Sequence, residues 1–215
     1  MNLIQEAPMT EDRTADLLQL PEETLLEWAQ AGDDEAFGVL VLKLDGPVRR
    51  FIRRLVGISD AEDDIVQDVF IKLHRKLSRI QPGQGLRPYL FRMVRNRTYD
   101  ELRKLGRYEV LSLDDEPVEA YASFNSIPDG SEQPEETAHW LLIQLEVQAA
   151  MERLPELQRQ ALILFSEEGL SYNEIAEAMD TSIGTVKSRL FHAKQGLRRL
   201  LRPETLQALD VEFAR

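Results

Sequence analysis

The sequence contains no cysteine, which excludes disulfide bonds, thiol nucleophiles and cysteine-ligated zinc sites. Its three histidines, His74, His139 and His192, lie far apart and lack the spacing of metal ligands. No apolar stretch approaches the roughly 20 residues that a membrane-spanning helix needs. The first 20 residues lack the basic start and continuous apolar run of a secretory signal. We therefore expect a cytoplasmic protein without metal, cofactor or membrane insertion.

Two parts of the chain have the apolar spacing of helices. The length of 215 residues allows one large or two small domains, and 43% apolar residues suffice for cores. Apolar residues recur every three or four positions in residues 21–107, where three breaks suggest about four helices, and in residues 138–202. No segment alternates like a strand. The sequence therefore predicts an all-α protein with two helical domains.

The remaining segments read as a linker and two tails. Residues 108–137 hold nine acidic residues, no basic residue and three prolines, which predicts a flexible acidic linker. This linker is either a solubilising spacer or a DNA mimic that folds back onto basic surfaces. Residues 1–20 and 203–215 are expected to be tails, although the leucines at 17, 18 and 20 are compatible with a short helix.

Charge is sorted into blocks along the chain. The net charge of −12 argues at first against a nucleic-acid partner. However, residues 86–107 hold seven basic and two acidic residues, and residues 181–202 hold six basic residues and no acidic one. Such a chain can bind a polyanion locally while it remains acidic overall. The alternative interpretation is a set of solvated helix faces.

Residues 171–201 have the pattern of a helix-turn-helix. Ser171 and Glu174 form a capping box, Asp180-Thr181 predicts a tight turn, and Ser182 can cap a second helix. The buried stripe of that second helix is Val186, Leu190, Ala193 and Leu197. A helix with a polar, basic outward face fits the major groove, whereas the alternative is a hairpin that packs on another protein. The candidate DNA-binding residues are Thr185, Lys187, Ser188, Arg189, Phe191, His192 and Lys194.

A second capping box, Ser59 to Glu62, predicts the start of a helix that runs to about Leu77. Acidic residues in its first turn favour the helix dipole, which is a sufficient structural reason for them. Farther along, carboxylates share a face with the apolar Ile71, which favours a docking surface for a protein partner over plain solvation. The candidate docking residues are Asp60, Asp63, Asp64, Gln67, Asp68 and Ile71.

The next predicted helix begins near Pro88, after a glycine-rich loop at residues 81–85. One face of it interleaves basic groups with an aromatic ring, which suits a nucleic-acid backbone with a stacked base, as on single strands. The alternative is a solvated basic face. The candidate residues for this contact are Gln84, Arg92, Arg95, Asn96, Tyr99 and Arg103.

These motifs together resemble the bacterial RNA polymerase sigma factors of the extracytoplasmic-function type. The matching segments are Asp60 to Phe70, Leu86 to Lys104, Leu154-Pro155-Glu156 and Leu170 to Leu190, and the resemblance covers about residues 22–107 and 140–201. It implies a promoter-specificity subunit whose partners are core RNA polymerase, promoter DNA and an anti-sigma factor.

The resemblance also implies roles for each segment. The helix from Asp60 is similar to the segment that binds the clamp helices of polymerase. The loop from Gln81 and the helix after it resemble the part that opens and captures the minus-ten element, with Tyr89 where the family often has Trp. The helix-turn-helix resembles the part that reads the minus-thirty-five element. The linker then sets the distance between two simultaneous contacts.

Two other classes of function compete with this expectation. A helix-turn-helix regulator would bind duplex DNA without polymerase and oligomerise through its N-terminal half. An enzyme would need reactive groups, but the sequence has no phosphate-binding glycine loop, no cysteine, no histidine cluster and no recognisable carboxylate pair. We therefore expect no catalytic residue. Promoter-specific transcription with core polymerase would distinguish a sigma factor from a regulator.

Overall fold

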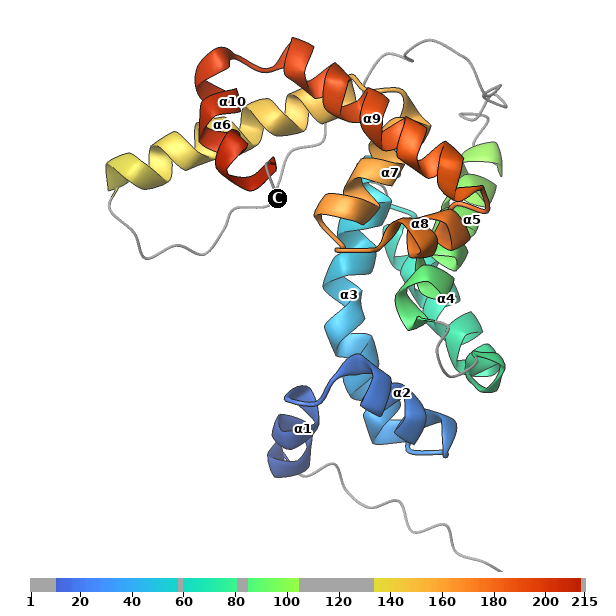
Figure 1. Cartoon of the computed structure of the whole chain (residues 1–215). Coiled ribbons are helices and arrows are strands. Elements are labelled where there is room, and N and C mark those ends of the chain that lie inside the picture. Colours follow the sequence, from blue (N-terminus) through green and yellow to red (C-terminus); the bar gives the residue numbers. More distant parts are fainter. Residues whose placement is uncertain (1–10, 58–59, 81–84, 105–133, 214–215) are drawn as a thin grey trace, which may run out of the picture.

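The computed structural model describes residues 11–57, 60–80, 85–104 and 134–213 (Figure 1). Within these ranges every regular element is helical and no strand occurs, which confirms the all-α prediction. The N-terminal half, residues 11–104, and the C-terminal half, residues 134–213, each hold five α-helices. Those of the N-terminal half, with one 3₁₀ turn, are α1 (Glu11–Leu18), α2 (Glu22–Gln30), α3 (Asp34–Val56), α4 (Glu62–Lys76), η1 (Leu77–Arg79) and α5 (Leu86–Lys104). Those of the C-terminal half are α6 (Pro134–Glu152), α7 (Glu156–Ser166), α8 (Tyr172–Ala178), α9 (Ile183–Leu200) and α10 (Pro203–Phe213).

The segments predicted as tails contain helices. In α1, Leu17 is buried and Arg13 pairs with Asp33 and Glu35 at the start of α3. Helix α10 runs through the predicted C-terminal tail, and α6 begins at Pro134, inside the predicted linker. Proline fits the first turn of a helix, where its missing N–H has no intrahelical partner. Most of the predicted linker lies outside the described residues.

Helix α3 runs unbroken through the Gly46-Pro47 pair, where the sequence predicted a break. Proline removes one backbone hydrogen bond, but the apolar stripe continues on both sides of it, with Leu44, Val48 and Phe51 fully buried. Burial of this stripe keeps the helix continuous. The side chain of Asp33 accepts hydrogen bonds from two backbone N–H groups of the first turn and caps the helix.

The start of α4 differs from the predicted capping box. The helix begins at Glu62, and Ser59 lies outside the described residues. The carboxylate of Glu62 is buried and accepts hydrogen bonds from Arg53 at 2.7 Å and from Arg49 at 3.0 Å. Glu62 therefore ties α4 to α3, and the Ser59 half of the predicted capping box is outside the described residues.

The helix-turn-helix forms as predicted. Ser171 and Glu174 make both bonds of a capping box at the start of α8, and Ser182 caps α9. Asp180, in the turn between them, has φ +53°, a left-handed conformation that Asp tolerates better than most residues. The predicted stripe Val186, Leu190, Ala193 and Leu197 is buried.

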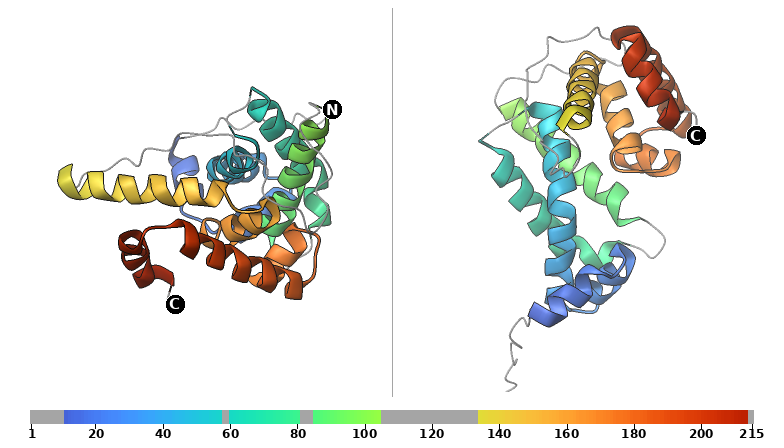
Figure 2. Two further views of the ribbon diagram at one scale, coloured as in Figure 1. Left: turned by 90° about the horizontal axis from the view of Figure 1, so that it is seen from above. Right: turned by 90° about the vertical axis from the view of Figure 1, so that its left-hand side faces the viewer.

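Helix α6 extends beyond the rest of the C-terminal half, and α10 folds back toward it (Figure 2). Glu146 of α6 joins them, because its carboxylate accepts hydrogen bonds from the backbone N–H and side chain of Arg202 and from the Thr205 hydroxyl. The hydrogen bonds from Arg202 and Thr205 lower the pKa of Glu146 to about 2.

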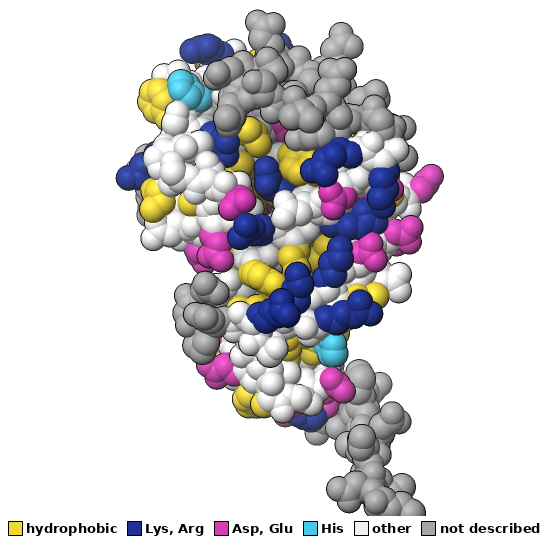
Figure 3. Space-filling view, turned by 90° about the vertical axis from the view of Figure 1, so that its right-hand side faces the viewer, with side chains coloured by type: hydrophobic (Ala, Val, Ile, Leu, Met, Phe, Trp, Pro, Cys, Tyr) yellow, Lys and Arg dark blue, Asp and Glu magenta, His cyan; other side chains and the backbone are white. Residues whose placement is uncertain are grey.

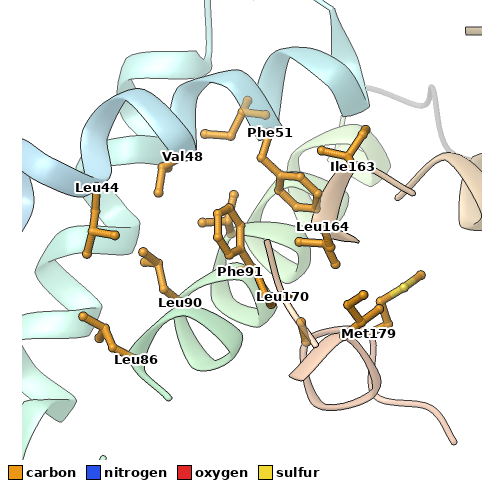
Figure 4. Packing of buried hydrophobic residues seen from close by; sticks show 14 of the residues in the cluster. Leu44, Val48, Phe51, Leu86, Leu90, Phe91, Ile163, Leu164, Leu170 and Met179 are labelled. Atoms are coloured by element: carbon orange, nitrogen blue, oxygen red, sulfur yellow. The ribbon is translucent and has the colours of Figure 1, made fainter. Parts of the chain in front are cut away.

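The two halves share one apolar core. Phe51 of α3 and Phe91 of α5 pack edge to face, with ring centroids 5.2 Å apart. Figure 4 shows Leu164, Leu170 and Met179 of the C-terminal half beside these rings. All five side chains are buried. We call this contact between α3 and α5 on one side and α7, α8 and their connecting loop on the other the seam.

Replacing Glu62 with glutamine should lower the free energy of unfolding at pH 7 by about 1–3 kcal/mol, because two guanidinium groups lose their shared buried acceptor. Burial raises the pKa of Glu62, but the hydrogen bonds from Arg53 and Arg49 outweigh it and hold the pKa below its usual value. The stabilisation is therefore present at neutral pH and is lost as the pH falls through the lowered pKa.

Urea unfolding at pH 7 and at acidic pH measures this effect. The matched control is Asp63→Asn, which removes an 84% exposed carboxylate bound to the same Arg49 and should cost about 0–1 kcal/mol. Equal losses in the two variants, or a Glu62→Gln effect that does not shrink on acidification, would contradict the role of Glu62.

Candidate DNA and polymerase interfaces

The predicted docking residues divide into two groups on α4. Asp64, Gln67 and Ile71 are exposed and share one side of the helix, as their spacing of three and four requires. Ile71 is 42% exposed, so this side of the helix offers one apolar side chain among polar ones. Asp68 instead faces α5, where it accepts a hydrogen bond from Arg97 at 2.7 Å that holds the pKa of Asp68 below its usual value.

The other two predicted docking residues lie at the helix start. Asp60 is exposed just before α4. Asp63 is exposed as well but binds Arg49 of α3 at 2.6 Å. The structure therefore brings Asp64, Gln67 and Ile71 together as a free surface and gives Asp63 and Asp68 partners within the fold.

The predicted single-strand face of α5 is partly covered by the C-terminal half. Arg95 donates a hydrogen bond to Gln160 at 3.2 Å, and its guanidinium lies 5.1 Å from the centroid of the Tyr99 ring. The Tyr99 hydroxyl donates a hydrogen bond to Glu156 of α7. Burial, together with the charge of Glu156, raises the pKa of Tyr99 above its usual range.

The other members of that face are more open. Asn96 and Arg103 are exposed, whereas Arg92 pairs with Asp180 of the helix-turn-helix at 3.2 Å. Gln84 lies outside the described residues. In this arrangement, then, the C-terminal half contacts three of the five described candidates.

The predicted duplex-reading face of α9 is mostly exposed. Lys187, Ser188, Phe191 and His192 are open to solvent. The ammonium of Lys194 lies 5.3 Å from the centroid of the Phe165 ring. Lys194 is half-buried, and two further members of this face are half-buried as well.

Thr185 and Arg189 are those two members. The Thr185 hydroxyl hydrogen-bonds with the N-cap residue Ser182 at 2.9 Å. Arg189 of α9 is half-buried near Arg95 of α5, and burial and the charge of Arg95 both lower the pKa of Arg189. Arg95 and Arg189, which the resemblance places on different DNA elements, therefore lie near each other in this arrangement.

Consecutive acids of the α7–α8 loop enter an arginine-rich part of the N-terminal half. Glu167 pairs with Arg54 at 3.1 Å. The side chain of Glu168 is 1% exposed and lies 3.4 Å from Arg87 and 3.8 Å from Arg50. Burial raises the pKa of Glu168, and the two arginines only partly oppose this effect. This contact could not be predicted from the sequence, because a short acidic loop carries no periodic pattern.

Some buried polar atoms near the seam make no hydrogen bond. Among the described residues, Arg54 Nη1, Arg159 Nε and Glu168 Oε1 are buried without a hydrogen-bond partner. Each such group costs about 1–3 kcal/mol relative to a solvated one. The two halves can therefore regain favourable hydration when they separate, which offsets part of the lost apolar contact.

A basic cluster that the sequence analysis did not assign occupies the end of α4 and the turn after it. Its members Lys72, Arg75, Lys76 and Arg79 are exposed. Lys72 and Lys104 of α5 both act on Asp68, so the cluster continues onto α5. Figure 3 shows Lys and Arg side chains gathered over this side of the molecule. The available signal was the run of four basic and no acidic residues in 71–80.

No group of metal-ligating side chains occurs among the described residues. In the same part of the chain, no helix is long and apolar enough to cross a membrane.

Comparison with protein families identifies both halves. A model of sigma-70 region 2 matches residues 40–108, and a model of sigma-70 region 4 matches residues 144–197. The RNA polymerase sigma-H factor of Pseudomonas aeruginosa is 33% identical over 188 residues, which are 87% of this chain and 97% of that protein. The ECF RNA polymerase sigma-E factor of Escherichia coli is 33% identical over 189 residues, covering 86% and 96%.

Solved structures show the same fold. CnrH in complex with the cytosolic domain of CnrY aligns with a TM-score of 0.56 at 24% identity, covering 83% of this chain and 96% of that chain. The sigma factor RpoE in complex with the anti-sigma factor NepR from Bartonella quintana aligns with a TM-score of 0.53 at 28% identity, covering 74% and 92%.

A charge swap across the seam tests whether ion pairs hold the halves together. Glu167→Arg places a cation against Arg54 and should weaken closure on the order of 2 kcal/mol, because like charges in contact repel. Adding Arg54→Glu should restore closure. The radius of gyration from small-angle X-ray scattering measures both effects, with Glu204→Arg on α10 as the control. An unchanged radius for Glu167→Arg would contradict this role.

Proposed function

The chain belongs to the extracytoplasmic-function sigma factors, which direct promoter recognition by RNA polymerase, and we propose that it does so through three surfaces on α4, α5 and α9. The observation that carries the proposal is the presence of sigma-70 regions 2 and 4 in one chain. A regulator that acts without polymerase needs only the helix-turn-helix. Members of this family are DNA-binding initiation factors, and we infer that this chain is not an enzyme and works in the cytoplasm, where polymerase and chromosome are.

The exposed side of α4 supports polymerase docking. Asp64 and Gln67 supply polar contacts around the apolar Ile71, which is the composition of a small interface with a buried centre. Asp60 lies at the edge of the same surface. Asp63 and Asp68 contribute indirectly, since they fix α4 against α3 and α5 through Arg49 and Arg97.

Helix α5 supports binding of the melted minus-ten strand. Arg95 already stacks over the Tyr99 ring, so the pair can accept an unstacked base beside a phosphate. Asn96 and Arg103 extend this surface along the helix, and the basic cluster on α4 adds positive charge beside it. Arg92 and Gln84 complete the proposed minus-ten set.

Helix α9 supports reading of the minus-thirty-five duplex. Its first turns expose Lys187, Ser188 and Phe191, which offer a cation, a hydroxyl and an apolar ring to base edges in the major groove. Thr185 and Arg189, four residues apart, lie on an adjacent side of the helix. His192 and Lys194 follow one turn later.

Opening of the seam is a step that this function requires. Arg95 and Tyr99 contact α7 in the closed arrangement, and Arg189 is half-buried beside them. Both DNA surfaces therefore become fully available only when the halves separate. A protein that favours the closed form would inhibit the factor, and we propose an anti-sigma partner, as the RpoE structure was solved with one.

Run-off transcription tests the function directly. Core polymerase supplied with this chain should produce transcripts from specific start sites on chromosomal fragments, and core polymerase alone should not. Binding of the chain to DNA fragments without any effect on transcription would instead favour a polymerase-independent regulator.

Charge reversal at Asp64 tests the docking surface. Asp64→Arg should weaken the affinity for core polymerase at least tenfold, about 1.4 kcal/mol, and leave the fold intact because the side chain is exposed. Glu27→Arg, an equal charge change on the exposed side of α2, is the matched control. Equal polymerase affinity for the two variants would remove α4 from the proposed interface.

A further inference from the structure

A groove runs beside the second half of α9, on the surface of the C-terminal half. It encloses about 350 Å³ between α9 and the turn that joins α6 to α7. Leu154, Pro155, Gly196 and Leu200 form its apolar floor. The glycine allows this close approach, since a Cβ at position 196 would lie 2.5 Å from Leu154 Cδ2.

The polar walls of this groove are cationic and neutral. Arg153, His192 and Arg199 are exposed on its rim, with the amides of Gln158 and Gln195 between them. No acidic side chain lines the groove, although the whole chain carries 38 acidic against 26 basic residues. Among the described residues, neither Arg153 nor Arg199 makes an ion pair. The site therefore presents unneutralised donors to an anionic, hydrogen-bond-accepting ligand.

The position of the groove along α9 limits what it can contact on DNA. The helix has 18 residues, which corresponds to a length of about 27 Å, whereas the major groove is about 12 Å wide. A recognition helix places its N-terminal residues on base edges. His192 follows Ile183 by nine positions, about 13 Å, and Arg199 lies about 24 Å along the axis. The groove is therefore at or beyond the edge of the bases, at the level of the phosphates.

We propose that this groove binds the sugar–phosphate backbone of duplex DNA beside the sequence that α9 reads. Arg153 and Arg199 contact phosphate oxygens, and Gln158 and Gln195 donate further hydrogen bonds. His192, which the sequence grouped with the reading face, positions the helix instead of reading a base. Such contacts set register and affinity without sequence information. This inference rests on the proposed DNA-binding function of the chain.

Duplex DNA fits the site better than an acidic peptide does. His192 and Gln195 belong both to the groove and to the side of α9 that bears Ser188, so a duplex seated on that side also passes the groove. The shallow apolar floor accommodates deoxyribose carbons. An acidic peptide would use the same cations but would gain nothing from their continuity with the reading face.

Adjacent arginines on α9 provide a matched test. Arg199 lines the groove, whereas Arg198 is exposed and does not line it. The full-length variants Arg199→Gln, Arg153→Gln and Arg198→Gln are titrated with a mixed-sequence 25-base-pair duplex over a range of salt concentrations. Arg199→Gln and Arg153→Gln should each reduce the salt slope by about 0.9, the value for one lost phosphate contact, and weaken binding several-fold on every sequence. Arg198→Gln, which continues the stripe of Lys194 outside the groove, should change both quantities less than either groove variant.

The outcomes separate this proposal from the proposed function. Equal effects of Arg199→Gln and Arg198→Gln, in a chain that still binds DNA and supports transcription, overturn the groove alone. Loss of binding to a polyglutamate peptide with unchanged DNA affinity would assign the groove to an acidic protein partner and also overturn it. A wild-type chain that neither binds DNA nor activates core polymerase would overturn the function itself. Thermal unfolding of each variant excludes loss of fold as the cause.

Discussion

The apolar packing of Phe51 and Phe91 with Leu164, Leu170 and Met179 determines which of the proposed DNA-binding side chains are covered. These rings and aliphatic groups lie at the junction of α3, α5 and the helix-turn-helix, so their burial fixes the two halves face to face. Arg95, Tyr99 and Arg189 lie beside the same junction, so closure of the two halves covers them in part. In the closed arrangement these three side chains contact the protein itself, and this competes with their proposed contacts to DNA.

The polar part of the seam moderates this apolar attraction. Glu168 enters the N-terminal half with one oxygen lacking a hydrogen bond, and Arg54 and Arg159 each leave one nitrogen in the same condition. Full satisfaction would make closure hard to reverse, since buried charges are costly to leave unpaired but stable once paired. The observed mixture of ion pairs and unpaired atoms is compatible with the opening that the proposed function requires.

Much of the fold was predictable because the responsible signals are local. The capping box at Ser171, the turn at Asp180 and the stripe from Val186 to Leu197 each act within a few residues, and all formed as predicted. The break at Gly46-Pro47 was wrong because burial along α3 outweighs the cost of one proline. The role of Glu62 was missed because its partners come from another helix.

For the candidate sites too, features within one helix could be predicted, whereas contacts between elements could not. The shared exposure of Asp64, Gln67 and Ile71 could be derived from helical spacing within one element. The partner of Asp68, the covering of Arg95 and the groove beside Arg199 arise only when separate elements pack, so sequence spacing cannot predict them.

The contact of Asp180 with Arg92 makes the closed arrangement sensitive to salt. This pair, whose side chains are 71% and 43% exposed, is weakened by dissolved ions, as are the phosphate contacts available after opening. Dissolved ions therefore weaken this part of the closed arrangement and the phosphate contacts at the same time.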